Sequence, residues 1–245
     1  AEEPLPAGGS CLLGSINLSA FVENPFTENA YFDFEEFKHC VQESVRALNE
    51  VLEEGLPLHP LPEQRESVSQ WRQIGLGIMG LADALIKLGL TYGEEDAVSV
   101  CDRIGFVMAD TAIAASARLA KELGAFPKCK VEEIMETPYF LANTTEGTKE
   151  LVRKYGLRNS QLLTIAPTGT LSTMLGISGG IEPIYANYYE RKTESLHGED
   201  VYYKVYTKIV KDFMEEHKVS DDRLLPDYFV TAMTLDYHQR IDMQS

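Results

Sequence analysis

A segment in the second half of the chain, Ile165–Ser172, combines residue types that can bind phosphate without a basic side chain. It reads Ile-Ala-Pro-Thr-Gly-Thr-Leu-Ser, and an apolar run from Gln161 to Ala166 leads into it. The residues from Ser172 to Gly176 could then form a helical turn. Backbone N–H groups at such a turn point toward one place, and Thr and Ser hydroxyls add further donors. Ordinary strand-to-helix turns share this pattern, so a phosphate site and a plain turn are both open.

Composition and charge narrow the possible functions. The 245 residues include 22 Lys and Arg against 38 Asp and Glu, which gives a formal net charge of −16. This balance disfavours an extended surface for nucleic acid or for an anionic membrane, but a nucleotide needs only a local group of donors. No apolar run is long enough to predict a membrane span. We expect a single domain over residues 1–245, as part of a longer protein.

The four cysteines do not predict a metal site. No two of them form a Cys-x-x-Cys pair, so we expect no metal, and a reducing, cytoplasmic location is the default. Cys40 and Cys101 lie among apolar residues of predicted helices and are expected in the core. Cys129 stands between two lysines and is expected to be exposed.

The spacing of apolar residues, together with the positions of glycine and proline, predicts a helix-rich α/β fold. Helices are expected over 34–55, 62–71, 94–123, 146–155, 200–217 and 227–244, with extended runs at 162–166 and 184–189. The spacing of Gly75, Gly77 and Gly80 fits Gly-x-Gly-x-x-Gly. Because no clear strand precedes it and no acidic residue follows at the expected distance, we interpret these glycines as sites of close helix packing. The single tryptophan, Trp71, is expected in the core.

Five segments together resemble the catalytic, large subunit of ribonucleotide reductases, in the order of that family and over essentially the whole chain. They are Cys11–Leu18, Ile74–Gly80, Ala166–Ser172, Gly180–Ile184 and His238–Gln244. The resemblance implies part of the family's ten-stranded α/β barrel, from its C-terminal portion. It also implies an oxidoreductase that reduces ribonucleoside diphosphates to 2′-deoxyribonucleotides for DNA replication.

The resemblance also implies roles for individual residues. Glu2 would be the carboxylate that helps to remove the 3′-OH proton, and Cys11 would be one of the two reducing cysteines. The substrate phosphates would be bound by Thr168, Gly169, Thr170, Leu171 and Ser172. Only the end of the family motif Asn-x-Cys-x-Glu is present at Ala1–Glu2. The radical-bearing cysteine would therefore precede Ala1, and we expect the isolated chain to be inactive.

The family's radical comes from adenosylcobalamin or from a metal-bearing small subunit, and its reducing equivalents come from thioredoxin-like proteins. We expect the chain itself to bind neither cofactor. Its expected partners are the ribonucleoside diphosphate, the remainder of the catalytic subunit and a second copy of the chain, without nucleic acid or membrane. Two alternatives stay open: a non-catalytic module that binds a nucleotide or phosphate, and a helical interaction domain.

Overall fold

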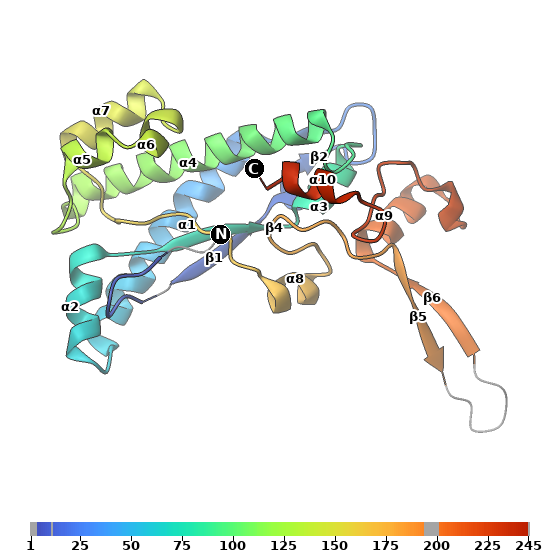
Figure 1. The fold of residues 1–245 in the computed structure, drawn as a ribbon, viewed down its shortest axis with the longest axis horizontal. Coiled ribbons are helices and arrows are strands. Elements are labelled where there is room, and N and C mark those ends of the chain that lie inside the picture. The colour runs from blue at the N-terminus through green and yellow to red at the C-terminus, as the bar shows by residue number, and fades with distance from the viewer. Residues whose placement is uncertain (1–3, 11, 194–200, 245) are drawn as a thin grey trace. The chain divides into compact units, whose positions relative to one another are not determined.

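The computed structural model describes residues 4–10, 12–193 and 201–244. Figure 1 shows their helices and strands. Their contacts form two compact units. Unit 1 draws on residues 1–16, 33–78 and 100–166, and unit 2 on residues 17–32, 79–99 and 167–245, as far as these are described.

Three extended segments lie side by side at the centre of unit 1. β1 (Leu13–Asn17) pairs with β4 (Gly75–Met79), and every residue of β4 is buried. The predicted strand at 162–166 is reduced to a parallel bridge between Leu163 and Leu76. A Cβ at Gly77 would lie 2.5 Å from the carbonyl oxygen of Thr164. The interpretation of the glycine run as a helix-packing site was therefore wrong for Gly75 and Gly77, because these two lie in a strand that its neighbour approaches closely, whereas Gly80 directly precedes α3.

The sequence predicted the long helices of the chain. The structure has α1 (Phe34–Gly55), α2 (Pro62–Trp71), α4 (Glu95–Leu123) and α7 (Glu146–Tyr155), together with the short helices α5 (Val131–Met135) and α6 (Pro138–Ala142). Asp33 caps α1 by accepting from the backbone N–H groups of Glu35 and Glu36, which satisfies two donors that have no partner inside the helix. The apolar stripe of α1, including Phe37 and Val41, is fully buried.

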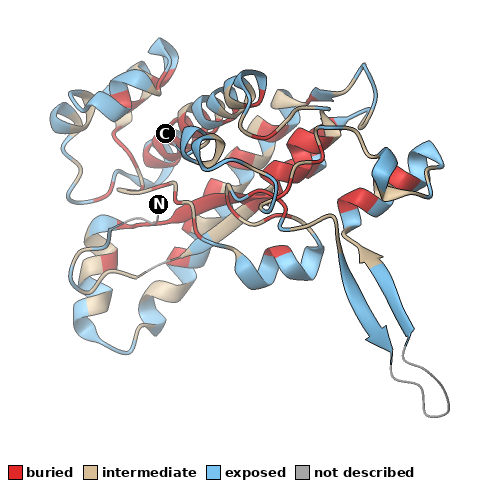
Figure 2. Ribbon diagram, turned by 45° about the vertical axis from the view of Figure 1, so that its right-hand side comes forward, coloured by how far each residue is buried: buried red, intermediate tan, exposed pale blue. Residues whose placement is uncertain are grey.

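Unit 2 contains smaller elements around the predicted phosphate segment. They are β2 (Val22–Glu23) paired with β3 (Tyr31–Phe32), α3 (Leu81–Lys87), α8 (Gly169–Leu175), β5 (Tyr188–Thr193) paired with β6 (Val201–Tyr206), α9 (Lys208–His217) and α10 (Tyr237–Asp242). The chain at β4 and α3 is buried, whereas α8 and the β5–β6 hairpin are largely exposed (Figure 2).

Three predictions failed in unit 2. The helix expected at 200–217 begins only at Lys208, because the Val- and Tyr-rich run Val201–Tyr206 favours a strand. The extended run expected at 184–189 becomes a regular strand only from Tyr188. The helix expected at 227–244 is confined to α10, after a turn bonded by the hydroxyls of Thr231 and Thr234. None of the helices that the structure describes is long and apolar enough to cross a membrane.

Candidate phosphate-binding site

The predicted phosphate segment forms a tight turn that opens a helix. α8 begins at Gly169, three residues earlier than the predicted helical turn at Ser172. Thr168 precedes the helix in the left-handed conformation, with φ at +53°, and its side chain does not cap the helix. Gly169, Thr170 and Leu171 are exposed, and an added Cβ at Gly169 would meet nothing within 4 Å. The turn therefore presents its backbone to the surface.

Three consecutive backbone donors are available at this turn. The N–H of Ser172 donates to the carbonyl oxygen of Thr168 at 2.8 Å. No acceptor among the described residues faces the N–H groups of Gly169, Thr170 and Leu171, as is usual for the first turn of a helix. Such donors allow an anion to bind, but an ordinary helix start has them as well.

The hydroxyl groups of the turn have different surroundings. Ser172 is 4% exposed, and its hydroxyl donates to the carbonyl oxygen of Gly169 at 3.3 Å. Thr173, which the sequence did not single out, donates to the same oxygen at 2.7 Å. The side chain of Ser172 therefore stabilises the turn from its buried side, while Thr170 is exposed.

A second loop of unit 2 packs against the turn from behind. The N–H of Gly180 donates to the hydroxyl of Thr168 at 3.2 Å. A Cβ at Gly179 would lie 2.8 Å from the carbonyl oxygen of Pro167, so only glycine allows this close approach. The N–H of Glu182 donates to the carbonyl oxygen of Gly179 at 3.0 Å. The second loop thus supports the turn from its buried side.

Asp83, an acid with no role predicted from the sequence, bonds to the same loop. Its carboxylate accepts from the backbone N–H of Ser178 at 2.7 Å, and the residue is only 2% exposed. Burial raises the pKa of Asp83, while the hydrogen bonds from Ser178 and the nearby charge of Lys87 oppose that shift. A lone aspartate inside an apolar helix was the available signal, since such an acid must be bonded when it is buried.

The two predicted catalytic residues, Glu2 and Cys11, lie outside the described residues. The other three cysteines are free thiols of intermediate exposure. Burial is the main cause that raises the pKa of Cys101, to about 12, and it also raises the pKa of Cys129. Cys129 is thus less exposed than predicted. Both thiols stay protonated near neutral pH, which is typical of structural cysteines.

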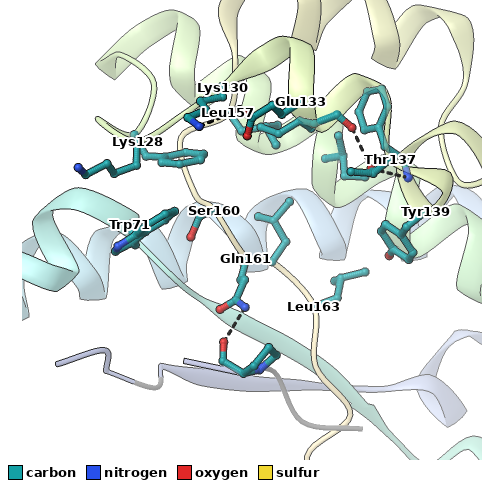
Figure 3. Close-up of a pocket in the computed structure, with 16 residues that line it drawn as sticks. Trp71, Lys128, Lys130, Glu133, Thr137, Tyr139, Leu157, Ser160, Gln161 and Leu163 are labelled. Atoms are coloured by element: carbon teal, nitrogen blue, oxygen red, sulfur yellow. Dashed lines mark hydrogen bonds and ion pairs between the residues drawn. The ribbon is translucent and has the colours of Figure 1, made fainter. Parts of the chain in front are cut away.

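Unit 1 contains a pocket of about 600 Å³ that the sequence did not predict (Figure 3). Lys130 and Glu133 lie on one side of it, while Gln161 and Leu163 lie on the other. Trp71 lines this pocket and is 37% exposed, so the prediction that it lies in the core was wrong. Lys130 and Glu133 pair with each other at 2.7 Å. The structure describes no cluster of three or more His, Cys, Asp or Glu that could hold a metal ion.

Comparison with known proteins identifies a family along the whole chain. A family model described as "Ribonucleotide reductase, barrel domain" matches residues 1–245. The ribonucleoside-diphosphate reductase subunit alpha of Chlamydia pneumoniae is 32% identical over 76% of this chain and 19% of that protein. A vitamin B12-dependent ribonucleoside-diphosphate reductase of Mycobacterium tuberculosis is 34% identical over 80% of this chain and 25% of that protein. The chain thus spans about a fifth to a quarter of these relatives.

A solved structure shares the fold. The alpha subunit of the class Id ribonucleotide reductase from Actinobacillus ureae matches 87% of this chain and 33% of that chain, with a TM-score of 0.59 and 20% sequence identity. The predicted helix-rich α/β fold is therefore confirmed.

Proposed function

Because this chain belongs to the ribonucleotide reductase family, we propose that it forms part of the catalytic subunit of a ribonucleoside-diphosphate reductase. The single observation that carries the proposal is the family match over residues 1–245. Relatives at 32% and 34% identity are named as ribonucleoside-diphosphate reductases. The reaction would replace the ribose 2′-OH by hydrogen, for the supply of deoxyribonucleotides.

We propose that the turn at 168–172 binds the diphosphate of the substrate. The open N–H groups of Gly169, Thr170 and Leu171 support this role, because the first turn of a helix favours negative charge. The hydroxyl of the exposed Thr170 would add a donor. Thr168 would set the shape of the turn, and Ser172 would hold it from the buried side.

The chemical steps are assigned to Glu2 and Cys11. Glu2 would accept the proton of the 3′-OH while the 2′-OH leaves as water, a role that needs a carboxylate within hydrogen-bond reach. Cys11 would be one of two thiols that reduce the substrate and become a disulfide in doing so. A thioredoxin-like protein would later reduce that disulfide. Alanine at either position should abolish turnover in the complete catalytic subunit; turnover retained by Glu2→Ala or Cys11→Ala would refute that assignment.

We propose that the chain binds no radical-generating cofactor itself. Relatives named as vitamin B12-dependent and relatives without that name match this chain at similar identity. A region common to both supports a role in substrate binding and reduction rather than in holding adenosylcobalamin or a metal centre. Added adenosylcobalamin should not change the absorption spectrum or melting temperature of the chain, and saturable binding would refute this proposal.

We also propose a cytoplasmic homo-oligomer. The described cysteines are free thiols, which agrees with a reducing compartment. The β5–β6 hairpin is a two-stranded sheet with Tyr189, Val201 and Tyr202 exposed, and exposed strand edges favour pairing with another chain. Light scattering that gives the mass of a monomer would contradict the oligomer.

A glycine substitution tests the phosphate site with little risk to the fold. Gly169→Ala adds a methyl group that meets nothing within 4 Å, but it would hinder a phosphate from approaching the backbone. In the complete catalytic subunit we expect the KM for ribonucleoside diphosphate to rise about tenfold, the loss of about one charge-assisted hydrogen bond. The measurement is steady-state reduction at several substrate concentrations.

Gly147→Ala is the matched control, because Gly147 also lies in the first turn of an exposed helix with nothing within 4 Å of an added Cβ. It should leave the KM unchanged. Equal KM values for Gly169→Ala and the unmodified protein would refute the phosphate assignment. A non-catalytic phosphate-binding module, which the same open N–H groups allow, would bind the nucleotide but show no turnover in the complete subunit.

A further inference from the structure

Asp83 occupies an unusual position for an acid. It lies in the first turn of α3, where Leu81, Ala82, Ala84 and Leu85 are all buried. Taking a carboxylate out of water is costly unless hydrogen bonds replace its hydration. Its clearest partner is the backbone N–H of Ser178, 2.7 Å from Oδ2. This hydrogen bond ties α3 to the loop that contains Ser178.

Ser178 is held by α3 through three separate hydrogen bonds. Its N–H donates to Asp83, its carbonyl oxygen accepts from the N–H of Gly80 at 2.7 Å, and its hydroxyl accepts from the N–H of Ala82 at 3.2 Å. Both backbone groups and the side chain of Ser178 are therefore engaged by one helix start. This arrangement fixes the residue in place and orientation.

The next two residues, Gly179 and Gly180, lie against the phosphate turn and so connect Ser178 to it. Gly179 lies so close to the turn that an added Cβ would be 2.8 Å from the carbonyl oxygen of Pro167. The N–H of Gly180 donates to the hydroxyl of Thr168 at 3.2 Å. Thr168 has a left-handed backbone, which is unfavourable for a threonine and persists only where the surroundings hold it. The loop after Ser178 supplies that support.

We propose that Asp83 is a positioning residue for phosphate binding: through Ser178 it holds the loop that keeps the turn at Thr168 in its binding shape. Asp83 does not contact the phosphate. The inference rests on the proposed function of the turn and extends it to a residue in a different element. In this proposal, α3 holds in place the loop that supports the phosphate turn.

The role requires a hydrogen-bond acceptor rather than a negative charge. The charged groups beside Asp83 are Lys87 on α3 and the pair Lys208 and Asp212 on α9, which line a cavity of about 270 Å³ with it. Lys87 donates to the carbonyl oxygen of Ser19, and Lys208 pairs with Asp212. The raised pKa of Asp83 reflects the same burial. An asparagine, which keeps an acceptor oxygen, should therefore replace this aspartate.

The test compares substitutions at Asp83 by the affinity for inorganic pyrophosphate, measured by isothermal titration calorimetry on the 245-residue chain. Asp83→Ala should raise the dissociation constant about tenfold, since one buried hydrogen bond is lost. Asp83→Asn should stay within about threefold of the unmodified protein for the same reason. The control is Asp110→Ala in unit 1, which removes a carboxylate that also accepts a backbone N–H, that of Thr145, at 2.7 Å.

The outcomes separate this inference from the proposed function. Binding by the unmodified chain with equal affinity in Asp83→Ala would overturn the positioning role and leave the phosphate site intact. Equal losses in Asp83→Ala and Asp83→Asn, or in the Asp110→Ala control, would also overturn it. Absence of pyrophosphate binding by the unmodified chain would refute the phosphate site and the inference together.

A second variant covers the case in which Asp83→Ala fails to fold. Gly179→Ala acts at the other end of the support, where the added methyl group must displace the loop from Pro167. The methyl group would also lie 3.1 Å from the hydroxyl of Ser172. Weaker pyrophosphate binding by folded Gly179→Ala therefore supports the step from the loop to the turn, and unchanged binding overturns the proposal. In the complete subunit, the KM for substrate should rise in Asp83→Ala more than kcat falls, and Asp83→Asn should restore it.

Discussion

Individual residues of the candidate site contribute mainly through their backbone. Gly169, Thr170 and Leu171 offer N–H groups, while the side chain of Ser172 is directed to the turn itself. Such a site is difficult to predict from sequence, because every residue except proline has a backbone N–H. What the sequence did show was the hydroxyl and glycine pattern that shapes the turn. The role of Asp83 could not be predicted from the sequence, because its partner Ser178 lies 95 residues away in the chain.

A polar cluster around the buried Arg72 in unit 1 yields a prediction about stability. Arg72 is 5% exposed and pairs with Glu53, which also accepts from Arg158 at 2.5 Å. Burial is the main cause that lowers the pKa of Arg72, and the positive charge of Arg158 lowers it further, while Glu53 opposes both. Glu53→Ala would leave two arginines without their shared carboxylate.

We expect Glu53→Ala to lower the free energy of unfolding by about 2 kcal/mol. This loss is smaller than the loss on breaking a fully buried ion pair, because the side chain of Glu53 is 40% exposed. Urea denaturation followed by circular dichroism measures this. The control Arg46→Ala removes an exposed pair with Glu122 at 3.4 Å and should cost less than about 1 kcal/mol. Equal losses in the two variants would contradict the account of the cluster.

At the scale of elements, the sequence predicted helices better than strands. The helices α2 and α7 have the predicted bounds, because Pro62 and Gly156 mark a helix start and a helix end. Helices follow from local periodicity, whereas strands depend on partners distant in the chain. The Gly75–Met79 segment forms a strand because β1, far earlier in the chain, pairs with it, and the segment 162–164 also bonds to Leu76.

Gly77 tests that pairing directly. Gly77→Ala places a methyl group 2.5 Å from the carbonyl oxygen of Thr164, a residue whose N–H donates to the carbonyl oxygen of Leu76 at 3.0 Å. The methyl group therefore pushes against the backbone of the paired segment. We expect a loss of about 2 kcal/mol in the free energy of unfolding, typical of overpacking. Thermal and urea denaturation measure the loss.

The control for this substitution is Gly105→Ala, inside α4, where an added Cβ meets nothing within 4 Å. It should stabilise the protein by up to about 1 kcal/mol, because alanine is the better helix former. If Gly77→Ala proves as stable as the unmodified protein, the close strand approach is not a constraint on the fold.

For the whole molecule, the family match gives the strongest constraint. One barrel-domain model spans residues 1–245, although the contacts separate two units. We propose that both units belong to a single domain, and two separate thermal transitions would contradict this. Sequence motifs identified the family because they are short and local. They could not locate the supporting contacts, which depend on the folded chain.

The central claim is that the turn at 168–172 binds the phosphates of a ribonucleoside diphosphate. The most direct measurement is the change in backbone amide signals of the isotope-labelled chain, by nuclear magnetic resonance, when a ribonucleoside diphosphate is added. We predict saturable shifts at Gly169, Thr170 and Leu171 that the unphosphorylated ribonucleoside does not produce. Saturable shifts confined to other residues, or equal shifts with both compounds, would contradict the account.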